Sequence, residues 1–115
     1  MSENTEPRIE SYHEFWPFYL QQHAKHDTRL WHIVGTGASS VLLVASLVSF
    51  SYQLFIAALI VGYGPAWVAH FAIEKNHPAT FRYPVWSLIS DYRMTAAWLT
   101  GRLDRELAEA GVPVK

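Results

Sequence analysis

The sequence contains no cysteine and has no excess of charge of either sign. Without cysteine, disulfides, thiolate metal sites and a thiol nucleophile are excluded. A metal ion in this protein would therefore be held by His, Asp or Glu side chains. The 115 residues include nine basic and ten acidic ones, so no charge pattern favours nucleic acid as a partner.

The signature motifs of several enzyme classes are also missing. There is no internal repeat, glycine-rich phosphate loop, Ser nucleophile elbow or Walker lysine, so nucleotide-binding and hydrolase functions have no support. The first residues are acidic and polar and do not lead into an apolar run, so we expect no cleaved signal peptide. We expect a loose tail at 1–10, a single domain at 11–110 and a short tail at 111–115.

Two long uncharged segments dominate what is present. Eighteen residues from Ile33 to Phe50 carry no charge, and the twenty from Leu54 to Ile73 have Tyr63 and His70 as their only ionisable side chains. Each segment matches a hydrocarbon layer of about 30 Å. We therefore predict an all-α integral membrane bundle whose transmembrane hairpin has spans at about 33–50 and 54–73. A soluble all-α bundle is the alternative, although so short a chain rarely buries two helices that are apolar on every side.

An aromatic helix is predicted before the hairpin, from about 11 to 23. Ser11 and Glu14 form a capping box, and Pro17 should kink the helix or mark a second start. The aromatic side chains suit a membrane interface, and a core-facing helix of a bundle is the alternative; they are Tyr12, Phe15, Trp16, Phe18 and Tyr19.

An amphipathic helix is predicted after the hairpin, from Pro84 to about Ala110. Its apolar face would lie across the membrane surface or pack on the other helices; it consists of Val85, Ile89, Tyr92, Ala96, Leu99 and Leu103. Inside the second span, the segment from Gly62 to Pro65 predicts a kink or a close-packing site.

The basic residues predict the orientation of the hairpin. The connecting turn has none, whereas eight of the nine flank the spans; these eight are Arg8, Lys25, Arg29, Lys75, Arg82, Arg93, Arg102 and Arg105. Both termini should therefore be cytoplasmic. The membrane would be the inner membrane of a bacterium or the endoplasmic reticulum of a eukaryote.

Hairpin geometry brings two distant histidines to one level. With Tyr52 as the apex, His32 lies twenty residues before it and His70 eighteen after it, or about 30 Å and 27 Å along helices. An ionisable group in a span is a functional candidate, although His70 as a hydrogen-bonded core residue and His32 as an interfacial anchor are the alternatives. Glu74 shares a helix face with His70, as a second ligand or as the group that orients it.

The other ionisable candidates are less defined by position. His23 and His26 lie three residues apart near the end of the aromatic helix. His13 and His26 fit solvated surroundings, and His77, which precedes Pro78, fits a loop. Asp91 could cap a helix, pair with a neighbouring cation or act in a site.

Four motifs together resemble the Mpo1-like family of small membrane proteins over roughly residues 11–103. They are Phe15-Trp-Pro-Phe-Tyr-Leu-Gln-Gln-His23, Arg29-Leu-Trp-His32-Ile-Val-Gly35-Thr, Gly62-Tyr-Gly64 and the run from His70 through Pro84 to Leu88. The resemblance implies an iron(II)-dependent dioxygenase that shortens long-chain 2-hydroxy fatty acids by one carbon, as in fatty-acid α-oxidation, with molecular oxygen as co-substrate and membrane lipid around it.

The resemblance also implies the site residues. His23, His32 and His70 fall on the family's recurring histidines and Glu74 on its recurring acid, so three histidines would bind iron, with Glu74 as a fourth ligand or as a partner that holds an imidazole. Arg29, Lys75 or Arg82 would meet the substrate carboxylate.

Two other classes of protein were weighed against this one. A di-iron membrane hydroxylase needs histidine pairs that include adjacent ones, and the chain has no His-His sequence. A non-catalytic membrane protein, either a scaffold or a metal-binding carrier with a histidine cluster at the cytoplasmic interface, would explain the hairpin equally well. Whether the chain forms a homo-oligomer stays open.

Overall fold

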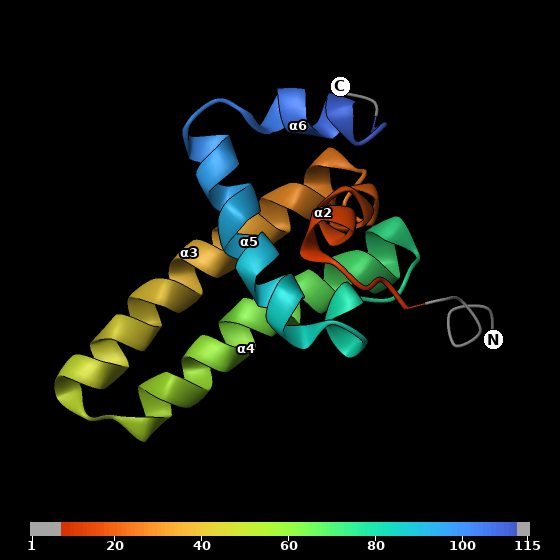
Figure 1. Cartoon of the computed structure of the whole chain (residues 1–115). Coiled ribbons are helices and arrows are strands. Elements are labelled where there is room, and N and C mark those ends of the chain that lie inside the picture. Colours follow the sequence, from red (N-terminus) through yellow and green to blue (C-terminus); the bar gives the residue numbers. More distant parts are fainter. Residues whose placement is uncertain (1–7, 113–115) are drawn as a thin grey trace.

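The computed structural model describes residues 8–112, and these form helices joined by short loops (Figure 1). The all-α prediction is confirmed for this part of the chain. The elements in order are α2 (Tyr12–Gln21), α3 (His26–Ser49), α4 (Tyr52–Val68), the π-helix η1 (Ala69–Glu74), the 3-10 helix η2 (Ala79–Phe81), α5 (Pro84–Leu99) and α6 (Leu103–Glu109).

Most of the two predicted tails, residues 1–7 and 113–115, lies outside the described residues. The described ends of the chain are packed. The backbone N–H of Ile9 donates to the Tyr83 hydroxyl at 2.9 Å, the Arg8 guanidinium lies over the Tyr83 ring, and Val112 is buried in the core.

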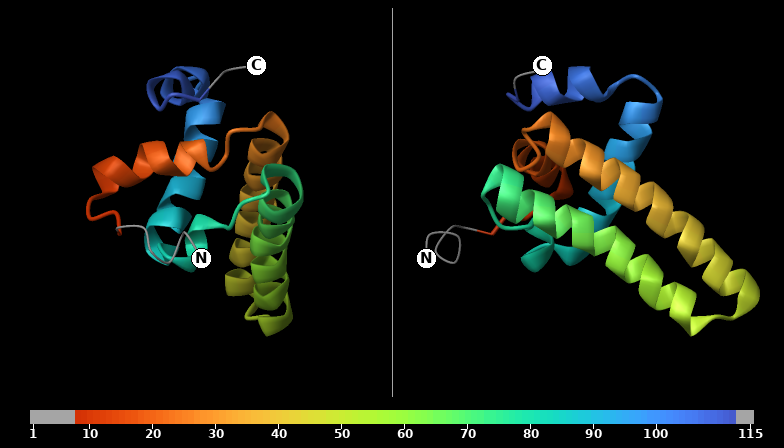
Figure 2. Two further views of the ribbon diagram at one scale, coloured as in Figure 1. Left: turned by 90° about the vertical axis from the view of Figure 1, so that its right-hand side faces the viewer. Right: turned by 180° about the vertical axis from the view of Figure 1, so that it is seen from behind.

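α3 and α4 form an antiparallel hairpin that projects from the rest of the molecule (Figures 1 and 2). α4 continues without interruption into η1. Two helical segments, His26–Ser49 and Tyr52–Glu74, are long and apolar enough to cross a membrane, and only 22% of the most apolar stretch of each is buried. The core helices of a soluble bundle would instead be mostly buried.

Glycines let the two hairpin helices approach closely. A Cβ at Gly35 would lie 3.1 Å from the Val61 carbonyl oxygen, and one at Gly62 would lie 2.9 Å from the Ser39 hydroxyl. The Ser39 hydroxyl also donates to the Ala58 carbonyl across the pair at 2.7 Å. The close-packing interpretation of the Gly62 region is therefore correct, and this contact fixes the relative register of α3 and α4.

The remaining helices cover one side of the hairpin base, as Figure 2 shows. The core between them is aromatic and aliphatic, with Phe15, Tyr19, Leu20, Met94 and Leu107 almost fully buried. The aromatic side chains of α2 therefore pack against α5 and α6, and the interface-belt interpretation is wrong for Phe15, Trp16 and Tyr19. The alternative of a core-facing helix describes them instead, because large rings contribute more when both faces are covered.

α2 begins at the predicted cap and is not interrupted by its proline. The Glu14 N–H donates to the Ser11 hydroxyl at 3.3 Å. Pro17 lies in a continuous helix of ten residues, so it does not mark a second start. Pro17 is the sixth of these residues and has no N–H to donate to the His13 carbonyl, so the helix continues past one missing intrahelical hydrogen bond.

The predicted helix from Pro84 to Ala110 is two helices. α5 ends at Leu99, and Gly101 follows with a φ of 77°. The Arg102 N–H then donates to the Ala97 carbonyl at 2.8 Å, an arrangement that closes a helix at a left-handed glycine. Gly101 was the signal for this break, and the chain turns there into α6.

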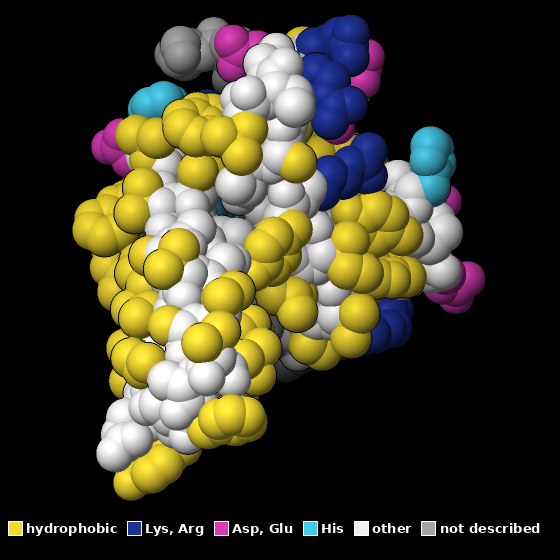
Figure 3. Space-filling view, turned by 90° about the vertical axis from the view of Figure 1, so that its left-hand side faces the viewer, with side chains coloured by type: hydrophobic (Ala, Val, Ile, Leu, Met, Phe, Trp, Pro, Cys, Tyr) yellow, Lys and Arg dark blue, Asp and Glu magenta, His cyan; other side chains and the backbone are white. Residues whose placement is uncertain are grey.

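The α5 part of the apolar face predicted for the C-terminal helix points outward, whereas Leu103, in α6, is buried in the core. Val85, Ile89 and Leu99 are at least half exposed, whereas Ser87, Ser90, Met94 and Ala97 form the buried face of α5. Figure 3 shows hydrophobic side chains spread over the hairpin, with Lys, Arg, Asp and Glu gathered away from its tip. Most of the large exposed apolar side chains of the described residues therefore belong to the hairpin and α5.

Candidate metal centre

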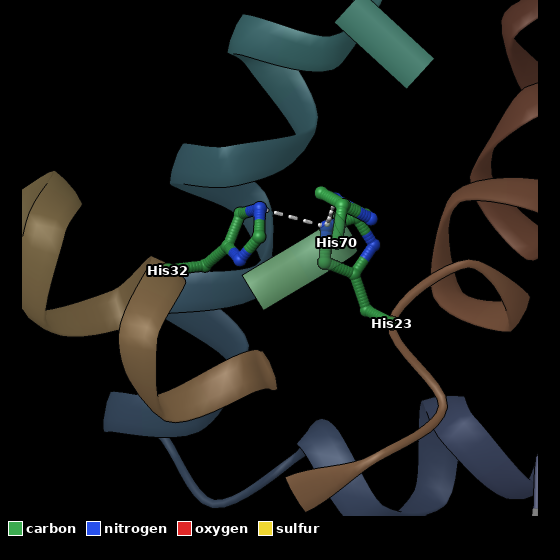
Figure 4. A group of neighbouring side chains, drawn as sticks. All are labelled: His23, His32 and His70. Carbon is green, nitrogen blue, oxygen red and sulfur yellow. Dashed lines mark hydrogen bonds between the residues drawn. The ribbon is translucent and has the colours of Figure 1, made fainter. Parts of the chain in front are cut away.

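Three histidines from three separate segments meet at the base of the hairpin (Figure 4). His23 lies in the loop between α2 and α3, His32 in α3 and His70 in η1. All three are at least 95% buried. The His23 Nε2 atom lies 3.0 Å from that of His32 and 3.1 Å from that of His70. One ligand atom from each residue lies within 4.8 Å of the others.

The opposite ring nitrogen of each histidine faces an oxygen atom. The Nδ1 atoms of His23 and His32 lie 2.6 Å and 2.9 Å from the backbone carbonyls of Tyr19 and Thr28. The Nδ1 atom of His70 lies 2.7 Å from the Asn76 side-chain oxygen. These oxygens accept hydrogen bonds and cannot donate them, so each Nδ1 carries the proton. In the neutral rings each Nε2 therefore has a free lone pair.

Three lone pairs that face one another repel, and a cation between them removes the repulsion. A shared proton is the other way to relieve it. Burial first, and then the charges of His32 and His70, lower the pKa of His23 well below its usual value, which disfavours the proton. The arrangement therefore favours a metal ion.

The spacing of the nitrogens also suits a metal ion. Bonds from imidazole to a first-row transition metal are about 2.1 Å long, so two such ligands at right angles lie about 3.0 Å apart. The two closest Nε2 pairs match this value. The three ligand atoms all lie within 4.8 Å of one another, so the widest pair would move to within about 4.2 Å, the span of two such bonds, when an ion binds. Nitrogen ligands suit iron, zinc, copper and nickel, and three of them leave further coordination positions open.

Side chains of Arg29 and Asn76 hold the loop that carries His23 through hydrogen bonds to its backbone and side-chain oxygens. The Arg29 guanidinium donates to the carbonyls of His23 and Ala24, both at 2.8 Å. The Asn76 amide donates to the backbone and side-chain oxygens of Gln22 at 3.2 Å and 3.0 Å. These contacts hold the His23 ring, which also stacks on Tyr19 with centroids 4.1 Å apart.

His70 reaches the cluster from a π-helical turn. The turn ends at Lys75, whose φ is 62°, and the Asn76 N–H then donates to the His70 carbonyl at 3.0 Å. This closure folds Asn76 back, so that one residue contacts both His70 and the His23 loop. π-helical turns are rare in proteins, and those that occur are often found at functional sites.

The structure brings His23, His32 and His70 together but not Glu74. The Glu74 carboxylate accepts from the backbone N–H of Lys25 at 2.6 Å, at the start of α3. Arg29 is buried and points to backbone carbonyls, whereas Lys75 is exposed and the Arg82 guanidinium lies over the Tyr83 ring. His13, His26 and His77 are exposed and lie outside the cluster.

A narrow cavity adjoins the three histidines. About 10 Å³ of it is open to the centre of a water-sized sphere, which is room for about one water molecule. Besides the histidines, its walls include Tyr63 and Trp67 of α4 and Ser87 and Asp91 of α5. The cavity is thus bounded by the cluster on one side and by α5 on another.

Asp91 is the carboxylate of this cavity. Its oxygen accepts a short hydrogen bond from the Tyr19 hydroxyl, and burial raises the pKa of Asp91 to about 7. Burial and the neighbouring Asp91 also raise the pKa of Tyr19. Sequence reasoning named Asp91 without assigning it a place, and it missed Asn76, Ser87 and the role of Tyr19, because no local pattern places these residues beside the histidines.

Comparison with known protein families gives a match over most of the chain. The family model described as "2-hydroxy-palmitic acid dioxygenase Mpo1-like" matches residues 9–103. This is the family that the sequence motifs resemble. No curated protein and no solved structure was found to match the chain.

Proposed function

We propose that this chain, which belongs to the Mpo1-like family, is an iron(II)-dependent dioxygenase that shortens 2-hydroxy fatty acids by one carbon. The observation that carries the proposal is the set of three buried Nε2 atoms, each with its ring turned by an acceptor at Nδ1. The description of the family supports a dioxygenase reaction and the substrate class.

His23, His32 and His70 are the proposed metal ligands. Bound iron would supply a Lewis acid for the carboxylate and hydroxyl of the substrate and a place to activate molecular oxygen. The protein orients the ligands and keeps them away from water: Tyr19, Thr28 and Asn76 fix the three rings through Nδ1, and all three histidines are buried. We assign Glu74 to holding the His23 loop through Lys25, in place of a fourth ligand.

The hairpin is proposed to span the membrane, with both termini in the cytoplasm. Its exposed apolar surface and the absence of charge near the tip support this placement. The cluster then lies at the cytoplasmic end of the spans, and the acyl tail of the substrate would lie in lipid beside the helices. Lys75 and Arg82, near that end, would attract the carboxylate.

Entry of the substrate head requires the cavity to widen. Trp67 lines it and is 37% exposed, and its ring packs edge-on against Phe81, which is 55% exposed, with centroids 5.3 Å apart. These two rings can move without opening the buried core. We propose that they form the rim through which the substrate enters.

The test combines metal analysis with turnover. Purified protein should contain or take up iron(II), and incubation with 2-hydroxypalmitate under air should give the acid one carbon shorter. His32→Ala should abolish both, whereas His26→Ala, an exposed histidine in the same helix, should leave both unchanged. Protein that binds no iron would contradict the proposal. Iron binding without turnover of any 2-hydroxy acid would leave a metal-binding carrier as the function.

A further inference from the structure

We propose that Ser87 and Asp91 of α5 recognise the 2-hydroxyl of the substrate: Ser87 donates a hydrogen bond to the hydroxyl oxygen, and Asp91 accepts one from the same hydroxyl. The inference rests on the proposed function and names the residues that would distinguish a 2-hydroxy acid from a plain fatty acid.

Position is the first argument. Ser87 and Asp91 are four residues apart in α5, so both side chains lie on one face of that helix. Both line the cavity that the three histidines line. A ligand held at the histidines therefore has α5 as a neighbouring wall.

The Ser87 hydroxyl is the second argument. The residue is 3% exposed, and its oxygen has no hydrogen-bond partner among the described residues. A buried hydroxyl without a partner is costly, which calls for an explanation. Thr28 is the other buried hydroxyl of this kind, but only Ser87 lines the cavity. A ligand in the cavity would supply the missing partner.

Asp91 is the third argument. The Tyr19 hydroxyl donates to one of its oxygens and thereby fixes the carboxyl group at the cavity wall. Tyr19 stacks on His23, so the acceptor and a proposed metal ligand are held by the same ring. No basic side chain pairs with Asp91 in the structure's described part. A carboxylate oxygen in this place can accept a hydrogen bond from a hydroxyl.

Such a wall would discriminate between two classes of acid. A site that is built to hydrogen-bond a substrate hydroxyl rejects the analogue without it, because buried polar groups are then left unpaired. A plain fatty acid has no 2-hydroxyl to accept from Ser87 and donate to Asp91, so the buried Ser87 hydroxyl would stay without a partner, whereas a 2-hydroxy acid would supply both hydrogen bonds. The preference for a 2-hydroxyl is therefore expected to reside in α5 as well as in the metal.

The experiment measures binding without turnover. Protein loaded with cobalt(II) is titrated with 2-hydroxyoctanoate and with octanoate, which are soluble probes, and the visible absorption of the metal is followed. Ser87→Ala and Asp91→Asn should each weaken binding of the 2-hydroxy acid about 10-fold, which is the loss expected for one good hydrogen bond. Binding of octanoate should change less than about 2-fold.

Ser90→Ala is the matched control. Ser90 is also a buried serine of α5, but its hydroxyl bonds to that of Tyr12 at 2.9 Å and does not line the cavity. It should leave both affinities unchanged. The cobalt spectrum of each variant before titration checks that the site is formed, and if Ser87→Ala fails this check, Asp91→Asn alone decides.

The outcomes separate the two proposals. Equal loss of both acids, or variants that behave like Ser90→Ala, would overturn the role of α5 while the metal site stands. Wild-type protein that takes up no cobalt would overturn the proposed function and this inference with it. A selective loss of the 2-hydroxy acid supports the assignment.

Discussion

The two ends of the α3–α4 hairpin differ in almost every physical respect. At the tip, Val48 is 76% and Phe50 95% exposed, and both are apolar. At the base, His32 and His70 are buried and polar, and every ring nitrogen lies near a nitrogen or oxygen partner. The same two helices therefore present apolar side chains outward at one end and polar side chains inward at the other.

The difference shows what each end requires. Exposed apolar surface of this size is stable when lipid covers it. Buried imidazoles are stable when hydrogen bonds or a metal ion satisfy them. The close approach at Gly35 and Gly62 connects the two ends, because it sets the register that makes His32 and His70 level.

The largest effect, on membrane insertion, is expected from a charge placed among the exposed apolar side chains of the hairpin. Val41 is 70% exposed on α3, and Val41→Arg should disfavour membrane insertion by about 3 kcal/mol. The measurement is the fraction of protein that resists carbonate extraction. Phe50→Arg at the tip, where the side chain can reach water, is the control with a small effect. If Val41→Arg changes nothing, as for a solvent-exposed site, the apolar half does not contact lipid.

The next effect tests the polar half. Asn76→Ala removes the acceptor of His70 and the two donors to Gln22, and it should weaken metal binding about 10- to 100-fold. Competition with a chelator measures the affinity. Asn76→Asp keeps an acceptor for His70 and should retain more of it. If Asn76→Ala bound the metal with wild-type affinity, the hydrogen bonds of Asn76 to His70 and Gln22 would not contribute to metal affinity.

The smallest effect is the pH dependence of folding stability, which should arise from Asp91 beside the histidine cluster and not from the tip of the hairpin. Folding raises the pKa of Asp91 from 3.8 to about 7, so its contribution to stability is full below about pH 4 and is lost as the pH rises toward about 7. The shift corresponds to about 3 kcal/mol between pH 5 and 8. Because Asp91 is only half-buried, we expect about half of that.

Thermal unfolding of the metal-free protein measures this prediction. Wild-type protein should unfold at a lower temperature at pH 8 than at pH 5, and Asp91→Asn should reduce the difference. Gln53→Glu at the exposed tip is the matched control, since it adds a carboxylate there and should leave the difference intact. An unchanged pH dependence in Asp91→Asn would place the titrating group elsewhere.

The parts of the fold that follow from length and local pattern were predictable. The hairpin follows from two uncharged segments, and the similar depth of His32 and His70 follows from their similar distances to the turn, twenty and eighteen residues. The cap at Ser11 is a local signal. The helical spacing of apolar residues in α5 was also visible in the sequence. That spacing does not reveal whether lipid or protein covers the apolar face, and in the structure this face of α5 is exposed.

The contacts that depend on rare backbone geometry were not predictable. Asn76 reaches His70 because a π-helical turn and a left-handed Lys75 fold the chain back, and neither has a reliable sequence signature. Asp91 meets Tyr19 only when α2 packs on α5. The family resemblance named the three histidines, whereas the residues that orient them emerge from tertiary packing.

The three-segment origin of the histidine cluster has a consequence for the life of the protein in the cell. A metal at His23, His32 and His70 would join segments that are up to 47 residues apart in the chain, and a ligand that binds only the folded state stabilises it by an amount that grows with the logarithm of the free ligand concentration. Iron availability would then set how much of the newly made protein survives quality control, so that cells short of iron would lose the protein itself as well as its activity.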